Sequence, residues 1–391
     1  MDKKIIAAAV VVVLVVAAVG AFLVINKGSS DDDDSLTTVS AIARVNTDGS
    51  GLYLKSQYNP EDFYKVVDGK YVFNKEAWGG LVFGTPGSSS IQHVQLKDIA
   101  TSMGLKFTKY TDGMQKNKDT LYFSDTIANA DAAITKNAKV LDGGILWEPQ
   151  YTKIISSDIY QGLLLTNDVF PGHTCCIIAG STSFMKANPE TTIAFLAAYS
   201  EAVQFIVDAQ ADTSSENYQK LIEICKKYTS GIEVQEIKDA LANVIYKFSD
   251  DNKTGSLSKL KADIAALEAD LEASGSITKK ITDLGFKDSK EFADAIVDDS
   301  YLTSAVKANV PPLNEKKTVT VAAINGDIHQ IGLRVAQDLG LFEKYNLDVV
   351  YSGLTNGGGV AQDLLNGHSD FGFLGAPPFT SNNVNGEYIH A

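Results

Sequence analysis

The order of elements near the carboxyl end most constrains how this chain can fold. From residue 318 to 378, short runs with strand-like alternation of apolar residues alternate with helical spacing. Val319, Val321 and Ala323 form the first such run, and Ile331 and Val335 open the first helix-like stretch. A β-α-β-α-β order predicts a parallel sheet with right-handed crossovers.

Ligands of such sheets bind beyond the carboxyl ends of the strands. The loops 325–329, 353–359 and 375–378 would all lie at that edge. The sequence therefore predicts a small-molecule site there, in a stretch that resembles the beginning of a domain more than its end.

The amino terminus predicts a membrane-spanning helix. Ile5 to Ile25 is an apolar run that follows Lys3 and Lys4, and it is long enough to cross about 30 Å of hydrocarbon. Lysines before the run favour a cytoplasmic amino terminus. We therefore expect an uncleaved anchor in residues 1–27, with the rest of the chain outside the cell; a cleaved signal peptide, and so a secreted protein, is the alternative.

Composition limits the classes of partner. The net charge of −14 argues against nucleic acid and against peripheral binding to anionic lipid. Cys175, Cys176 and Cys225 are too few for a disulfide framework and are expected to be buried free thiols. No phosphate loop, zinc spacing or serine–histidine–aspartate order is detectable, so neither a metal nor a cofactor is predicted.

The middle of the chain predicts a second α/β region. A buried-type strand at 81–83 leads into Gly84–Ser90 and a helix at 91–103, and a strand at 105–110, a helix at about 121–138 and a strand at 140–146 follow. Glycine, proline and three serines before a helix offer hydroxyl and N–H donors at a positive dipole end. This is a candidate cradle for a carboxylate, sulfonate or phosphate, although a serine helix cap would have the same pattern.

Several motifs together resemble the sulfonate, nitrate and taurine class of ABC-transporter substrate-binding proteins. They are Gly340-Leu-Phe342-Glu-Lys, Leu365-Asn-Gly367-His-Ser-Asp370, Gly372-Phe-Leu-Gly375-Ala-Pro-Pro378, Gly84 to Ser90, Trp147-Glu-Pro149 and Asn188-Pro-Glu190. The resemblance implies a two-lobed, type II periplasmic-binding-protein-like α/β fold, each lobe a parallel-rich sheet with helices on both faces, preceded here by a transmembrane helix. The expected parts are the anchor at 1–27, an acidic linker at 28–38, a first lobe from 39–77 and 174–391, and a second lobe from 78–173.

The order of the parts departs from that family. The family order corresponds to 318–391 followed by 42–307, whereas this chain has 42–307 first, joined to the rest by a linker at 306–317. This is the pattern of a circular permutation, which is tolerated where the old termini lie close together. Completion of the halves by exchange with a second chain is the alternative.

The resemblance implies an extracellular binding component, and no enzyme, that captures a small anionic or polar organic solute between two lobes. Its partners would be an ABC permease with its ATPase. A pyrimidine-synthase-like enzyme of the same fold, or a ligand-sensing ectodomain acting through a partner, are the alternatives. The candidate ligand contacts are Asn325, Asp327, His329, Gly357, Gly358, Gly375, Ala376 and Asn46 in the first lobe, and Ser88, Ser89, Ser90, Trp147 and Glu148 in the second.

Overall fold

The computed structural model describes residues 38–273, 275–307 and 309–386. The predicted membrane span and the acidic linker up to residue 37 lie outside these ranges. Within them, one helix, α7 (Pro189–Ala211), combines the length and hydropathy needed to cross a membrane. That helix packs in the core of the protein, with 67% of its apolar window buried.

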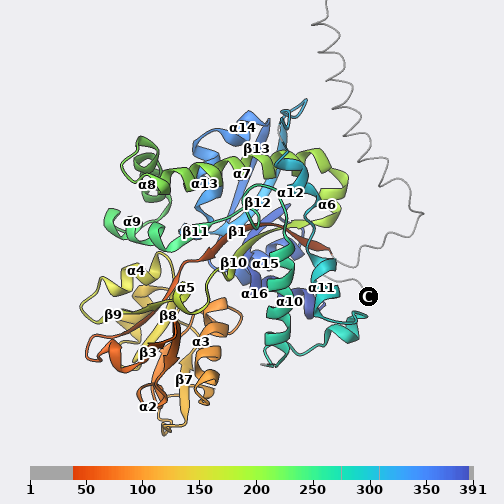
Figure 1. Cartoon of the computed structure of the whole chain (residues 1–391). Helices are drawn as coiled ribbons and strands as arrows, with labels where there is room; N and C mark the ends of the chain where they lie inside the picture. Colours follow the sequence, from red (N-terminus) through yellow and green to blue (C-terminus); the bar gives the residue numbers. More distant parts are fainter. Residues whose placement is uncertain (1–37, 274, 308, 387–391) are drawn as a thin grey trace, which may run out of the picture. The chain divides into compact units, whose positions relative to one another are not determined.

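The described chain is built on two six-stranded mixed sheets (Figure 1). The first sheet has the order β11 (Val244–Tyr246), β1 (Val39–Asp48), β10 (Thr174–Ser181), β14 (Phe371–Gly375), β12 (Lys317–Ile324) and β13 (Leu347–Leu354). The second has the order β6 (Lys106–Lys109), β7 (Thr120–Ser124), β5 (Val82–Gly84), β8 (Gly143–Trp147), β2 (Ser50–Lys55) and β9 (Tyr160–Leu165). We call the first sheet with its helices the first lobe, and the second sheet with its helices the second lobe.

The helices divide between the lobes in the same way. The first lobe carries α6 (Thr182–Ala187), α7 (Pro189–Ala211), α8 (Glu216–Tyr228), α9 (Val234–Asn243), α10 (Ser258–Ala273), η3 (Ile281–Leu284), α11 (Ser289–Ile296), α12 (Ser300–Ala305), η4 (Ile328–Gln330), α13 (Ile331–Asp338), α14 (Leu341–Lys344), α15 (Gly357–Leu365) and α16 (Ala376–Val384). The second carries η1 (Pro60–Asp62), α2 (Lys75–Trp78), α3 (Ile91–Ser102), η2 (Ala132–Lys136), α4 (Gln150–Ile155) and α5 (Thr166–Val169), with the hairpin β3 (Tyr64–Val67) and β4 (Lys70–Phe73).

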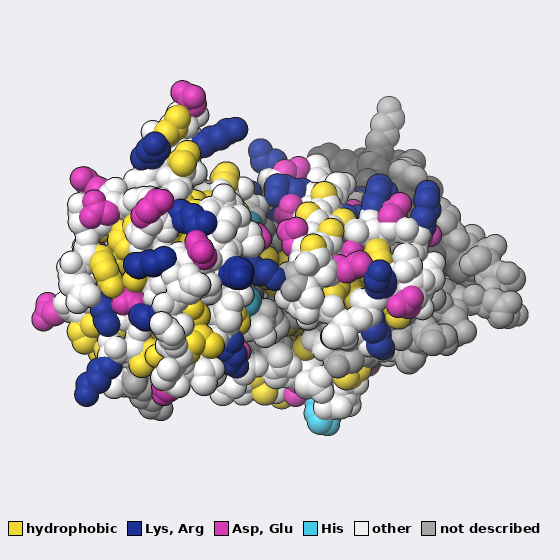
Figure 2. All heavy atoms as spheres, turned by 90° about the horizontal axis from the view of Figure 1, so that it is seen from below, with side chains coloured by type: hydrophobic (Ala, Val, Ile, Leu, Met, Phe, Trp, Pro, Cys, Tyr) yellow, Lys and Arg dark blue, Asp and Glu magenta, His cyan; other side chains and the backbone are white. Residues whose placement is uncertain are grey.

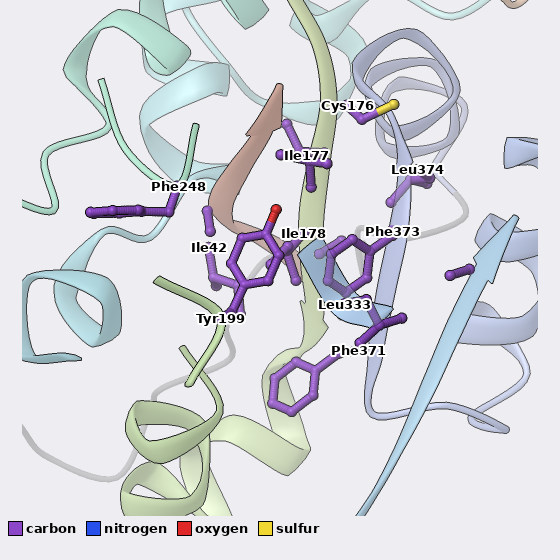
Figure 3. Close-up of a cluster of buried hydrophobic side chains, with 14 of the residues drawn as sticks. Ile42, Cys176, Ile177, Ile178, Tyr199, Phe248, Leu333, Phe371, Phe373 and Leu374 are labelled. Atoms are coloured by element: carbon purple, nitrogen blue, oxygen red, sulfur yellow. The ribbon is translucent and has the colours of Figure 1, made fainter. Parts of the chain in front are cut away.

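The first sheet joins strands from opposite ends of the sequence. Its β12 pairs in parallel with β13 and β14, as predicted from residues 318–378. The early strand β1 and the late strand β14 both pair antiparallel with β10, so they run parallel to each other on its two sides. Figure 3 shows the core at this junction, where Ile42 from β1, Ile177 and Ile178 from β10, and Phe371 and Phe373 from β14 come together.

Aromatic stacking fixes the packing of both lobes. In the first lobe the ring of Phe195 on α7 stacks on Phe371 at 4.4 Å between centroids. In the second, Trp78 is fully buried and stacks on Phe83 at 4.9 Å. Such pairs add about 0.5–1.5 kcal/mol each beyond the burial of their area, so they help to hold helices against a particular strand.

Three expectations differ from the structure. Residues 50–77, which we assigned to the first lobe, join the second, because β2 pairs with β8 and β9. The expected helix at about 121–138 is wrong: residues 120–124 form β7, whose run Leu121-Tyr122-Phe123 suits a strand buried between β5 and β6. The sheets are mixed rather than parallel-rich, since the strands that cross between the lobes are antiparallel to their neighbours.

Candidate functional site

The chain passes between the lobes at two crossings that are bonded to each other. One crossing is Asp48-Gly49-Ser50, between β1 and β2; the other lies between α5 and β10. The fully buried carboxylate of Asp48 accepts the N–H of Gly172 at 3.1 Å and lies 3.1 Å from Nδ1 of His173. Burial lowers the pKa of His173, but the hydrogen bond and charge of Asp48, together with Cys175 and the carbonyl of Phe170, raise the pKa overall. The two crossings therefore form one hinge.

His329 reaches the same hinge from the late half of the sequence. Asp327 accepts the backbone N–H of His329 at 2.9 Å, which begins η4 directly after the turn at Gly326. The Nε2 atom of His329 lies 2.8 Å from the carbonyl oxygen of Gly49. Burial opposes the charged imidazolium, yet the neighbouring Cys175 thiol and Asp327 carboxyl raise the pKa of His329 to about 9. Burial raises the pKa of Asp327 to about 6.

Two cysteines and His329 form a buried cluster that has metal-ligand spacing. The Sγ atoms of Cys175 and Cys176 lie 3.8 Å apart, and Cys175 Sγ lies 3.8 Å from Nδ1 of His329. The hydrogen bond with Cys176 lowers the pKa of Cys175 well below its usual range, while the same contact raises the pKa of Cys176. Within the described ranges, these three residues form the group of His, Cys, Asp or Glu side chains that lie close enough together to bind one metal ion. Their two sulfur atoms suit a thiophilic cation. All three cysteines are free and buried, as expected.

The predicted contacts of the first lobe take different places. Asn325 is exposed in the turn after β12, and Gly357 and Gly358 form the first turn of α15, capped by Asn356. Gly375 precedes α16 and Ala376 is buried in its first turn. Asn46 is wholly buried inside the sheet, where it accepts the N–H of Cys176 at 3.3 Å. It stabilises the sheet from inside.

In the second lobe, the serine cradle divides into two roles. Ser90 caps α3, accepting the N–H of His93 at 3.2 Å, and its hydroxyl donates to the carbonyl of Gly87 at 2.8 Å. Ser88 and Ser89 are exposed in the preceding turn. Their hydroxyls are therefore the part of the cradle that faces solvent.

Trp147 and Glu148 also separate. Trp147 is half-buried at the end of β8, opposite Ser50. Glu148 is buried and accepts from the N–H and the hydroxyl of Thr152, each at 3.0 Å, and from the Nδ2 of Asn243 on α9 at 2.9 Å. Glu148 thus ties the second lobe to the first beside the hinge.

A cavity of about 320 Å³ opens at the carboxyl end of β12. It gathers two predicted residues, Asn325 and Asp327, with residues that no sequence motif indicates. The additional lining includes Lys227, Tyr228, Arg334 and Tyr351. They come from α8, α13 and β13, so no single motif could have indicated them. The predicted residues of the second lobe do not line this cavity.

A furrow also marks the surface seen in Figure 2, with histidine side chains inside it and lysine or arginine side chains along its margins. The lobes approach each other at α3 and α10. Burial raises the pKa of Asp98 on α3 to about 6, and the nearby Asp270 on α10 makes a smaller contribution in the same direction. Gln92, also on α3, donates to the hydroxyl of Ser50 at 2.9 Å. The first turns of α3 therefore lie against the hinge.

The architecture is that of a two-lobed α/β protein whose lobes are joined by a double crossing. The chain belongs to the NMT1-like family, whose profile matches residues 11–225. This membership confirms the family resemblance noted from the sequence. No curated protein sequence matches the chain.

Two solved structures resemble it. One is a ligand-binding component of an ABC-type import system from Staphylococcus aureus, crystallised with zinc, with 13% identity and a TM-score of 0.44 over 66% of this chain and 74% of that one. The other is the periplasmic nitrate-binding protein NrtA from Synechocystis PCC 6803, with 16% identity and a TM-score of 0.42 over 71% of this chain and 69% of that one.

Proposed function

We propose that this protein is the substrate-binding component of an ABC importer and that it encloses a small anionic or polar organic solute between its lobes. Sulfonates, nitrate, taurine-like zwitterions and related solutes form the expected class. The role is one of binding and delivery, without catalysis. The observation that carries the proposal is the double crossing at Asp48 and His173, because a pair of bonded crossings lets two rigid lobes rotate about one axis.

The lobe surfaces beside the hinge suit a polar solute. Ser88 and Ser89 offer exposed hydroxyls just before α3, where the helix dipole favours negative charge. On the first lobe, the glycines at 357–358 leave backbone N–H groups near the start of α15. An anion would rest on hydroxyls, N–H groups and helix dipoles. A solute that contacts both lobes stabilises the closed state by its differential contacts.

A thermal-shift screen tests this function. The full chain would be heated with taurine, an alkanesulfonate, nitrate, bicarbonate or a pyrimidine precursor. A solute present at a hundred times its Kd should add about 2.7 kcal/mol of stability. Ser88→Ala combined with Ser89→Ala should weaken the binding of that solute without a large loss of stability in the unliganded protein. If no solute of the panel stabilises the chain, the receptor function is wrong.

We also propose that the binding lobes lie outside the cytoplasmic membrane, held there by residues 5–25, and that they deliver solute to a permease with its ATPase. The support is the apolar run itself, which lies outside the described residues. Fractionation of cells that express the full chain tests the anchor. Detergent, and not alkaline carbonate, should release the protein; release by carbonate would contradict the anchor.

The circular permutation is part of the same proposal. A chain that continued from β14 through α16 into β1 would form a β-α-β unit, since β14 and β1 run parallel with β10 between them. The described residues contain one copy of each strand of both sheets. The mass of the detergent-solubilised protein, measured by light scattering, distinguishes closure within one chain from exchange between two: a monomer is expected, and an obligate dimer would refute it.

A further inference from the structure

The chain has two arginines, Arg44 and Arg334, and their surroundings differ sharply. Arg44 is 1% exposed, and its guanidinium bonds Asp250 at 2.7 Å and Asp263 at 2.9 Å. Its positive charge is therefore neutralised by two carboxylates inside the first lobe.

Arg334, on α13, has no carboxylate partner among the described residues. Its guanidinium carbon lies 3.3 Å from the ring centre of Tyr351 and 4.7 Å from that of Tyr228. One nitrogen donates to the side chain of Gln337 at 2.9 Å. Two aromatic faces thus hold the cation in place, and cation–π contact leaves the N–H edge of a guanidinium free to donate.

The carboxylate best placed to neutralise Arg334 is already used. Asp338 follows Arg334 by one turn of α13, the spacing of an intrahelical ion pair. Its oxygens instead accept from Nζ of Lys227 at 2.8 and 2.9 Å, and from the hydroxyl of Tyr228 at 2.7 Å. Asp338 therefore does not neutralise Arg334, and the positive charge of Arg334 is available to a ligand in the adjoining cavity.

That cavity is the one of about 320 Å³ at the end of β12. All of its lining residues belong to the first lobe: they come from residues 227–230, 323–327 and 330–334 and from Tyr351. Apolar walls at Ala323, Ile324 and Ile331 stand beside the polar groups of Asn325 and Ser230. Its volume lies at the small end of ligand sites in proteins.

We propose that this cavity binds a small carboxylate with a compact apolar body, and that Arg334 anchors the carboxylate. A planar guanidinium matches a planar carboxylate with two parallel hydrogen bonds. The apolar walls receive the body of the ligand. Because the second lobe contributes no lining residue, binding here does not require the lobes to close. This site is distinct from the solute site between the lobes and goes beyond the proposed transport function.

Asp327 tunes the cavity. Its carboxylate also lines the wall and would repel a bound anion, yet its structural task is to cap η4 by accepting the N–H of His329. Asparagine retains a cap acceptor without the charge. Asp327→Asn should therefore strengthen carboxylate binding, the opposite direction from a variant that loses Arg334.

Calorimetric titration of the full chain with benzoate, and with its neutral analogue benzamide, tests the site. Benzoate should bind at least tenfold more tightly than benzamide. Arg334→Gln should abolish this preference and Arg334→Lys should reduce it. Asp327→Asn should increase the affinity for benzoate. Lys290→Gln, which removes one exposed charge of the same lobe, should leave the affinity unchanged. Thermal unfolding establishes that each variant is folded.

The inference would be overturned by no benzoate binding by the folded wild type at millimolar concentration, by equal binding of benzamide, or by unchanged affinity in both Arg334 variants. Ser88→Ala with Ser89→Ala separates the two sites. If these two serine substitutions weaken benzoate binding as much as Arg334→Gln does, the ligand occupies the site between the lobes and the proposed first-lobe site is wrong. Failure of the solute screen would leave this test unaffected, since no residue of the second lobe lines the cavity.

Discussion

The Nε2 atom of His329 lies 2.8 Å from the carbonyl oxygen of Gly49, which also accepts the N–H of Glu148 at 2.9 Å. Residues from the early crossing, the second lobe and the late half of the sequence thus meet at one carbonyl group. The contact depends on the absence of a side chain at position 49, where the backbone has φ +87°.

Gly49→Ala should destabilise the protein by about 2 kcal/mol or more. A Cβ there would lie 2.4 Å from Nε2 of His329 and 2.9 Å from Val244, and the left-handed backbone adds strain of about 1 kcal/mol. Gly69→Ala is the matched control, because Gly69 has φ +74° with nothing within 4 Å of the added atom. Urea unfolding should show a clearly smaller loss for Gly69→Ala; equal losses would mean that the hinge tolerates the side chain.

Arg44→Met should cost about 3 kcal/mol of unfolding free energy. It leaves Asp250 and Asp263 without their buried partner, and removal of one member of a buried ion pair costs several kcal/mol. The control is Lys290→Met, whose exposed pair with Asp294 should contribute less than about 0.5 kcal/mol. Chemical denaturation measures both. A loss for Arg44→Met no larger than that of the control would contradict a structural role for Arg44.

His93 should make stability depend on pH. Burial lowers the pKa of His93 to about 4, since its ring packs between Phe107 and Phe123 while Nδ1 lies 3.1 Å from the Thr85 hydroxyl. The unfolded chain takes up a proton near pH 6.5 and the folded chain only near 4. Stability from this group is therefore present above pH 6.5 and is lost as pH falls toward 4, by up to about 1.4 kcal/mol per pH unit.

Comparison with His93→Gln isolates that contribution. The carboxyls of Asp98 and Asp327, with pKa values raised to about 6, act in the opposite direction: they favour the folded state as pH falls from 6 toward 4. They are common to both proteins and cancel in the difference. The gap in unfolding free energy between wild type and His93→Gln should shrink between pH 7 and pH 5, and a constant gap would exclude the predicted titration.

Ser90→Ala should cost about 1 kcal/mol of stability, because Ser90 caps α3 through the N–H of His93. Replacing both exposed serines, Ser88 and Ser89, by alanine should lower the stability by less than about 0.5 kcal/mol. Thermal unfolding measures these effects without ligand. A large loss in the double variant would show that those serines support the fold, and their effect on solute affinity could then not be assigned to contact.

The sequence predicted several parts of this architecture for a physical reason. The strands at 319–323, 347–351 and 371–374 and the helices between them carry their own periodicity, and glycine marks where each helix ends or begins. Local pattern was less useful for β7, where an aromatic run also suited a helix. It could not place β2 in the second sheet, since that depends on which partners a strand finds after crossing the hinge.

The candidate site shows the same limit. Asn325 and Asp327 could be selected because a turn after a strand is a local signal, and both line the cavity. Asn46 and Glu148 had suitable chemistry, but the structure commits them to buried hydrogen bonds. No local signal separates a buried carboxylate that holds two lobes together from one that awaits a ligand.

Thus the sequence alone determined the family and most of the alternation of strands and helices, because these follow from periodicity and from motifs read along one chain. Only the tertiary structure decided which polar groups are already satisfied. The two arginines make the point: they are equivalent in the sequence, but folding brings two carboxylates to Arg44 and two tyrosine rings to Arg334. Charge compensation depends on neighbours distant along the chain, so it is settled by packing.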